Sequence, residues 1–98
     1  MKLEFHERVP VEADEAVEWY ENQSQHLGAR FLAAYRISVE TILKRPRTFG
    51  YWRNSSHVRR MGMHRFPFDI LFRILPGRIR ILCVRHHKRH PSYGMHRR

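Results

Sequence analysis

The C-terminal half of the chain carries side chains of the kinds that act on a phosphate ester. Arg65, His86, Arg89 and Tyr93 are the main candidates. An arginine can hold a phosphate with two hydrogen bonds, and a histidine can accept or donate a proton near neutral pH. A tyrosine can stack on a base or donate a proton. Metal-independent RNA cleavage by attack of a 2′-hydroxyl needs these groups, so His86, Arg65 and Tyr93 are the candidate catalytic residues.

Further cations stand close to these groups in the sequence. Arg59, Arg60, Lys88 and Arg89 are candidates for contacts with the phosphates of a nucleic acid. Arg59 and Arg60 are adjacent on a predicted strand, where successive side chains point to opposite faces. At most one of these two arginines therefore serves a given site.

Each candidate catalytic residue also has a structural interpretation, and the sequence leaves the choice open. His86 could hydrogen-bond to the backbone at the edge of a sheet, and Tyr93 could pack the C-terminal tail against the domain. Arg65 could pair with Asp69, because the two would lie on the same face of one strand.

Neither a metal nor a cofactor is expected. Nucleases with two metal ions need clustered carboxylates, and Asp69 is the only acid after residue 49. Cys83, His86, His87 and His90 have a spacing that resembles a zinc site. However, Cys83 and His86 would point to opposite faces of a strand.

Charge is distributed very unevenly along the chain. The sequence has 19 Lys and Arg against 9 Asp and Glu, a formal net charge of +10. Residues 1–49 hold eight acids and seven bases, whereas residues 50–98 hold one acid and twelve bases. A segment that basic attracts polyanions over a long range, so a nucleic acid or an acidic protein is the expected partner. A solubilising surface is the alternative interpretation.

The periodicity of apolar residues predicts the elements that position these groups. A first strand is expected at residues 2–6, helices at 11–24 and 25–44, and strands at 57–63, 66–74 and 79–83. Glu12 and four other acids are expected on the exposed side of the first helix. The predicted fold is α+β with the order β-α-α-β-β-β, in which a helical hairpin packs on one face of an antiparallel sheet. Residues 85–93 follow as a basic tail.

The last two strands should form a hairpin around Pro76-Gly77, which has the chemistry of a turn. If Ile74 pairs with Ile79, the same register sets Ile70 opposite Cys83, apolar on apolar.

Two segments resemble the RelE/ParE superfamily of toxins. Residues 65–74, RFPFDILFRI, resemble the family pattern R-F-P-[FY]-x-[IL]-x-[FY]-R-[IL]. Residues 79–91 resemble its ending, I-x-V-x-H-x-[KR]-R-x-P, in which His86 takes the place of the histidine. The helical hairpin that ends at Pro46 also matches. The likeness covers nearly the whole chain and looks strongest to the plasmid-stabilisation, ParE-like branch.

This resemblance implies the toxin component of a bacterial type II toxin–antitoxin pair, which a small acidic antitoxin wraps and blocks. RelE-like members cut mRNA in the ribosome and ParE-like members poison DNA gyrase, so the shared fold cannot choose between them. Three hypotheses follow: an mRNA interferase that uses His86, a gyrase inhibitor without catalysis, and an inactive nucleic-acid-binding relative. RelE carries lysines before and on its second strand. The absence of lysine between Lys44 and Lys88 favours a ParE-like target.

Length and composition set the remaining expectations. A chain of 98 residues predicts one small domain spanning residues 1–98. No long apolar run predicts a membrane span, no signal-peptide pattern opens the sequence, and Cys83 has no partner for an internal disulfide. These observations predict a cytoplasmic protein.

Overall fold

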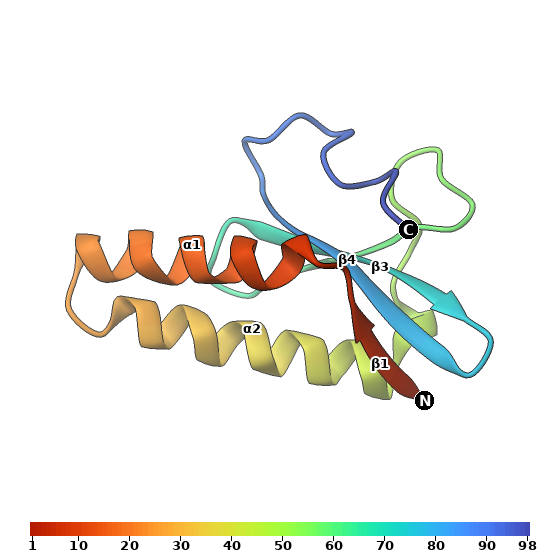
Figure 1. Ribbon diagram of the computed structural model, residues 1–98, viewed down its shortest axis with the longest axis horizontal. Coiled ribbons are helices and arrows are strands. Elements are labelled where there is room, and N and C mark those ends of the chain that lie inside the picture. The colour runs from red at the N-terminus through yellow and green to blue at the C-terminus, as the bar shows by residue number, and fades with distance from the viewer.

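A computed structural model describes residues 1–98 and confirms the predicted α+β fold (Figure 1). In chain order its elements are β1 (Lys2–Phe5), α1 (Arg8–Gln23), α2 (Leu27–Lys44), the 3-10 helix η1 (Pro46–Thr48), β2 (Arg59–Gly62), β3 (Phe68–Leu75) and β4 (Arg78–His86). The two helices run side by side as a hairpin, and the chain after β4 folds back as an irregular tail. Neither helix has the length and apolar character needed to cross a membrane.

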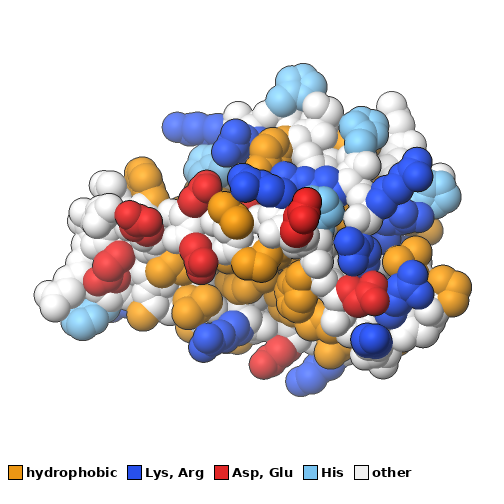
Figure 2. Space-filling view, in the orientation of Figure 1, with side chains coloured by type: hydrophobic (Ala, Val, Ile, Leu, Met, Phe, Trp, Pro, Cys, Tyr) orange, Lys and Arg blue, Asp and Glu red, His pale blue; other side chains and the backbone are white.

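The uneven charge of the sequence becomes a separation in space. Acidic side chains lie along α1, whereas most Lys, Arg and His side chains gather towards the sheet and the tail (Figure 2). The basic half of the chain therefore presents its own surface, distinct from the helical hairpin.

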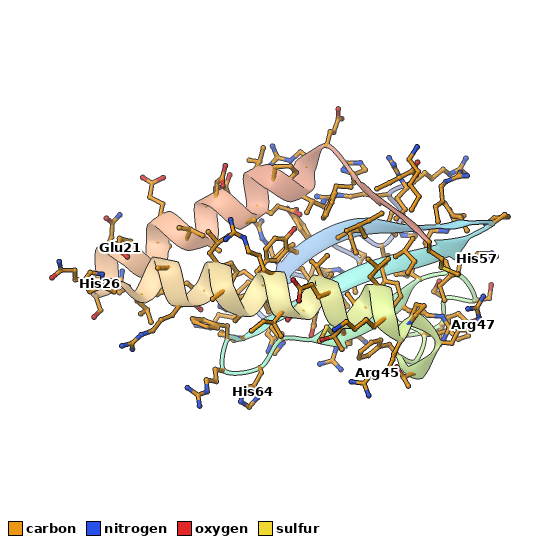
Figure 3. The ribbon with its side chains drawn as sticks, turned by 90° about the horizontal axis from the view of Figure 1, so that it is seen from below. Glu21, His26, Arg45, Arg47, His57 and His64 are labelled. Atoms are coloured by element: carbon orange, nitrogen blue, oxygen red, sulfur yellow. The ribbon has the colours of Figure 1, made fainter.

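The helical hairpin is closed by one carboxylate and one close backbone contact. Glu21 Oε2 accepts the backbone N–H of His26 at 3.0 Å, and Glu21 Oε1 accepts that of Gly28 at 3.0 Å (Figure 3). A Cβ atom at Gly28 would lie 2.6 Å from the carbonyl oxygen of Val17. The small residue thus lets α2 start directly beside α1.

The sheet has the strand order β1-β4-β3-β2 and is mixed, which corrects the expectation of an antiparallel sheet. β2, β3 and β4 are antiparallel neighbours, but β1 runs parallel to β4, with Leu3 opposite Ile79. The pattern of a four-residue strand cannot specify its direction, because the direction depends on the path of the whole chain between β1 and β4.

The predicted pairing of β3 with β4 is confirmed near their turn, where Ile74 lies opposite Ile79. A bulge further along β4 shifts the register by one residue, so that Ile70 pairs with Val84 rather than with Cys83. An extra residue in one strand of a pair reverses the faces of all residues beyond it. Val84 therefore joins the core beneath the helices, and Cys83 belongs to a cluster on the opposite face.

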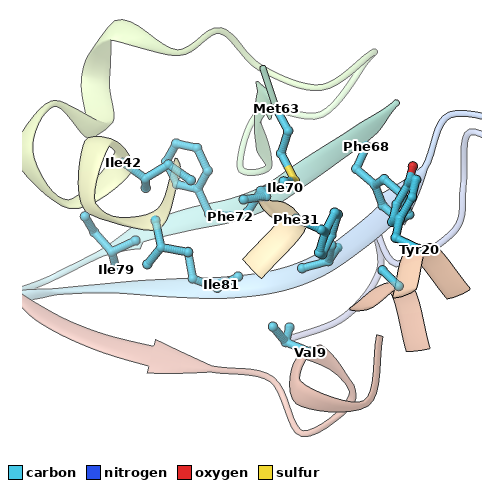
Figure 4. Packing of buried hydrophobic residues seen from close by; sticks show 13 residues of the cluster. Val9, Tyr20, Phe31, Ile42, Met63, Phe68, Ile70, Phe72, Ile79 and Ile81 are labelled. Atoms are coloured by element: carbon cyan, nitrogen blue, oxygen red, sulfur yellow. The ribbon is translucent and has the colours of Figure 1, made fainter. Parts of the chain in front are cut away.

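The core beneath the helices is mostly aliphatic, and Tyr20, Phe31 and Phe68 bring aromatic rings together within it (Figure 4). The rings of Tyr20 and Phe31 stack with their centroids 5.5 Å apart, and Phe31 meets Phe68 edge-on at 5.1 Å. Such pairs add to the free energy gained by removing apolar surface from water. This contact fixes α1 and α2 against the end of β3.

The opposite face of the sheet is also covered, although the sequence predicted only one clearly buried face. Val58, Leu71, Leu82 and Cys83 form a second cluster, against which Trp52, Tyr93 and Met95 pack. These three larger side chains come from the loop before β2 and from the tail. The first five residues of β3, 68–72, are consequently all buried.

Gly94 allows the tail to approach this second cluster closely. Its φ is 78°, and a Cβ atom there would lie 2.4 Å from Cys83 Sγ. Gly77 has a similar φ of 70° but no atom within 4 Å of the added Cβ. We expect Gly77→Ala to lower the free energy of unfolding by about 1–2 kcal/mol, from backbone strain alone. Gly94→Ala should cost about 1–3 kcal/mol more, because the methyl group also displaces the tail.

Urea denaturation of the two variants and the parent measures this difference. Equal losses in the two variants would contradict the close packing of the tail on Cys83.

Candidate functional site

Three of the predicted site residues line one cleft. His86, Arg89 and Tyr93 border a space of about 220 Å³ between α1 and the C-terminal tail, and Glu12 and Trp19 of α1 form its other side. Arg65 is not among the residues that line this cleft. The candidate catalytic residues are therefore only partly brought together.

His86 ends β4 and is half-buried, with its ring edge-on to Phe68 at a centroid distance of 5.0 Å. Burial lowers the pKa of His86, and the nearby charge of Lys88 lowers it further. Its Nδ1 accepts the backbone N–H of Lys88 at 3.0 Å. A neutral ring that accepts at Nδ1 carries its proton on Nε2. Because Nε2 is then a donor, it cannot take a proton from a 2′-hydroxyl.

The hydroxyl of Tyr93 is already engaged. It donates a hydrogen bond to Glu12 Oε2 at 2.5 Å, while the guanidinium groups of Arg89 and Arg97 lie over its ring at 4.5 and 5.0 Å from the centroid. Burial raises the pKa of Tyr93, and the hydrogen bond to Glu12 raises it further. The contacts match the structural interpretation, in which Tyr93 packs the tail.

Glu12 corrects a prediction, because the sequence placed it on the exposed side of the first helix. It is only 7% exposed. Its Oε1 accepts the backbone N–H of Val84 at 3.0 Å, and its Oε2 pairs with Arg97 Nη2 at 2.9 Å. Glu12 precedes the buried Ala16 by one helical turn, so its position in the apolar stripe was the signal that could have revealed it.

Arg65 does not have the structural role predicted for it. It is exposed in the loop between β2 and β3 with a φ of 71°, because β3 begins only at Phe68. It does not pair with Asp69, whose oxygens bind other cations. The turn before the strand removes Arg65 from the face on which Asp69 lies.

Asp69 is the centre of an ionic cluster that sequence reasoning missed. It is 2% exposed. Its Oδ1 lies 2.8 Å from Arg60 Nε and 3.1 Å from His87 Nε2, and its Oδ2 lies 3.0 Å from Arg85 Nη1. Arg85 is also buried, and its Nη2 donates to the carbonyl oxygen of Arg89 at 2.7 Å. The cluster therefore joins β2, β3 and β4 to the first turn of the tail.

The four predicted nucleic-acid contacts do not form a single patch. Arg59 and Arg60 do point to opposite sides of the sheet. Arg59 Nη1 donates to the carbonyl oxygen of Phe49 at 2.7 Å, whereas Arg60 reaches Asp69. Arg60 and Arg89 line a second hollow. Lys88, the residue before Arg89, is exposed.

The thiol of Cys83 is not accessible from the surface. It is fully buried, its Sγ lies 3.9 Å from the carbonyl oxygen of Tyr93, and burial raises its pKa to about 12. No group of three or more His, Cys, Asp or Glu side chains is arranged to hold a metal ion.

We expect Glu12→Ala to lower the free energy of unfolding by about 2–4 kcal/mol. The substitution leaves Arg97 and the N–H of Val84 without their acceptor, and an unpaired buried donor or charge is costly. Glu15→Ala, at an exposed residue lining the same cleft, should change stability by less than about 0.5 kcal/mol. Chemical denaturation compares the two, and similar losses would argue against the Glu12 anchor.

The reactivity of Cys83 should report the burial of this face. A rise in pKa from 9.0 to about 12 lowers the thiolate fraction near pH 8 about a thousandfold, and only the thiolate reacts. Alkylation by iodoacetamide should therefore be at least about a thousandfold slower in the folded protein than in urea. Comparable rates in the two states would show that the tail does not cover the thiol.

No family model matches the sequence, and no curated protein matches it significantly. Among solved structures, a chain of the chromosomal ParDE TA system from P. aeruginosa is similar, with a TM-score of 0.67 and 21% sequence identity. The match covers 88% of this chain and 95% of that chain. At this identity the likeness bears on the fold, and the RelE/ParE-like fold that the sequence motifs predicted is confirmed.

Proposed function

We propose that this chain is the toxin component of a bacterial type II toxin–antitoxin pair. The observation that carries the proposal is the fold, which it shares over most of its length with a chain of a ParDE TA system. The motifs of β3, β4 and the tail support it independently. The basic surface formed by residues 50–98 suits an acidic antitoxin, since opposite charges steer association and disfavour wrong partners.

We further propose that the toxin acts by binding its target, as a ParE-like inhibitor of DNA gyrase does, and not by cleaving RNA. Three observations support this choice. Nδ1 of His86 already accepts the backbone N–H of Lys88, the hydroxyl of Tyr93 is bound to Glu12, and Arg65 does not line the cleft. General acid–base catalysis needs a base and an acid within reach of one reacting position, and the three predicted catalytic residues supply no free base there.

Cleavage of mRNA in the ribosome is the second candidate function. It is favoured by the shared cleft of His86 and Arg89 and by the excess of Lys and Arg in residues 50–98. This function would require the tail to shift on the target, so that Tyr93 leaves Glu12. Rearrangements of that kind accompany a minority of complexes.

The two functions predict different first effects in a cell. Expression of the chain from a tightly controlled promoter should stop the incorporation of labelled thymidine within minutes, before that of labelled methionine, and induce the DNA-damage response. Earlier loss of methionine incorporation, with new 5′ ends in transcripts, would favour mRNA cleavage instead. Normal growth with both labels unaffected would contradict the toxin itself.

A further inference from the structure

A second hollow lies on the face of the sheet that is turned away from the helices. It has a volume of about 300 Å³ and is bordered by the loop before β2, by β2 and by the tail. We call it the Trp52 hollow after the indole in its wall. Four arginines and one carboxylate line it, a formal excess of three positive charges. The arginines are Arg53, Arg60, Arg85 and Arg89.

The floor of the Trp52 hollow is rigidly built. The guanidinium of Arg85 bonds to Asp69 and to the carbonyl oxygen of Arg89, and it lies 5.0 Å from the centroid of the Trp52 ring. The indole N–H of Trp52 donates to the carbonyl oxygen of Pro91 at 3.0 Å. These contacts join the loop to the tail and to β4 before any ligand arrives.

The single carboxylate cannot balance the remaining cations. Both oxygens of Asp69 are already bonded, to Arg60 and His87 on one side and to Arg85 on the other. Arg85 Nε is buried without any hydrogen-bond partner. A buried donor without a partner costs stability, and an anion in the hollow would offset the excess of positive charge around it.

The mouth of the hollow still has donors to offer. Arg60 uses only its Nε on Asp69 and its side chain is 43% exposed, so its two terminal nitrogens remain free to donate. Arg53 is exposed, and its guanidinium contacts only the ring of Trp52, at 5.1 Å from the centroid. Guanidinium groups match the oxygens of phosphates with paired hydrogen bonds.

We propose that the Trp52 hollow binds a phosphate group, with Arg53 and Arg60 as its donors and Arg89 on the third side. A carboxylate has one charge and two oxygens in a plane, which suits one guanidinium. A phosphate ester has up to two charges and oxygens that diverge in three directions, which suits cations from three elements. The phosphate comes from a nucleotide or from a nucleic-acid strand. The site does not depend on the proposed toxin function.

Trp52 provides the reporter. The chain has two tryptophans, so Trp19→Phe leaves Trp52 as the only one. Sodium pyrophosphate should change the fluorescence of this variant saturably. Its dissociation constant should be at least tenfold lower than that of sodium acetate at the same ionic strength. Equal effects of the two salts, or no saturable change up to 10 mM, would overturn the site, because screening alone would then explain the response.

Paired variants locate the binding. In the Trp19→Phe background, Arg53→Gln and Arg60→Gln should each weaken pyrophosphate binding at least tenfold. Arg59→Gln is the matched control for Arg60→Gln, because it removes the neighbouring charge on the opposite face of β2. Unfolding curves confirm that each variant is folded. Arg53 pairs with no carboxylate, so Arg53→Gln should not disturb the fold. It still tests the site if Arg60→Gln unfolds the protein. A similar loss in Arg59→Gln would overturn the assignment to this hollow.

A final comparison identifies the source of the phosphate. Thymidine monophosphate and an eight-residue deoxythymidine strand are titrated into the same Trp52 reporter. Tighter binding of the strand per phosphate, lost in Arg53→Gln, supports a nucleic-acid backbone. Equal binding per phosphate supports a small phosphorylated ligand, and binding of neither would overturn the proposal.

Discussion

The structure depends on the need to surround two buried carboxylates with hydrogen-bond donors. Glu12 and Asp69 each lie within the protein, where an unpaired charge would cost several kcal/mol. Their donors come from β2, from β4 and from the tail. The tail must therefore fold back over the sheet, and in doing so it covers the second apolar cluster. Electrostatic pairing and apolar burial thus require the same path of the chain.

This path determines what each candidate site can do. Because Tyr93 is held by Glu12, the cleft between α1 and the tail has a fixed wall in place of a mobile acid. Because Arg85 is held by Asp69, the first turn of the tail stays beside Trp52, and the remaining arginines converge around that indole. One set of contacts occupies a candidate catalytic group in the first cleft and arranges the arginines of the proposed anion site in the other.

Local patterns were enough to predict the order of the elements and the hairpin of β3 and β4, because periodicity and turn chemistry act over a few residues. The bulge that moves Cys83 to the other face, the direction of β1 and the position of Arg65 depend on contacts between distant segments. The sequence pointed to His86 and Tyr93, which line one cleft, but it gave no sign of their hydrogen bonds. Asp69 stood out only as a lone acid in a basic half, and its burial became visible only with the register of the sheet.

The central claim is that this protein acts by binding and needs no proton transfer from its predicted catalytic residues. The most direct measurement is growth arrest by the double variant Arg65→Ala, His86→Ala, expressed at the same level as the parent. Arg65 is exposed and His86 half-buried, so a folded double variant is expected. The account predicts that growth still stops, with thymidine incorporation falling as in the parent. Normal growth of cells that contain the folded double variant would contradict it and restore the nuclease interpretation.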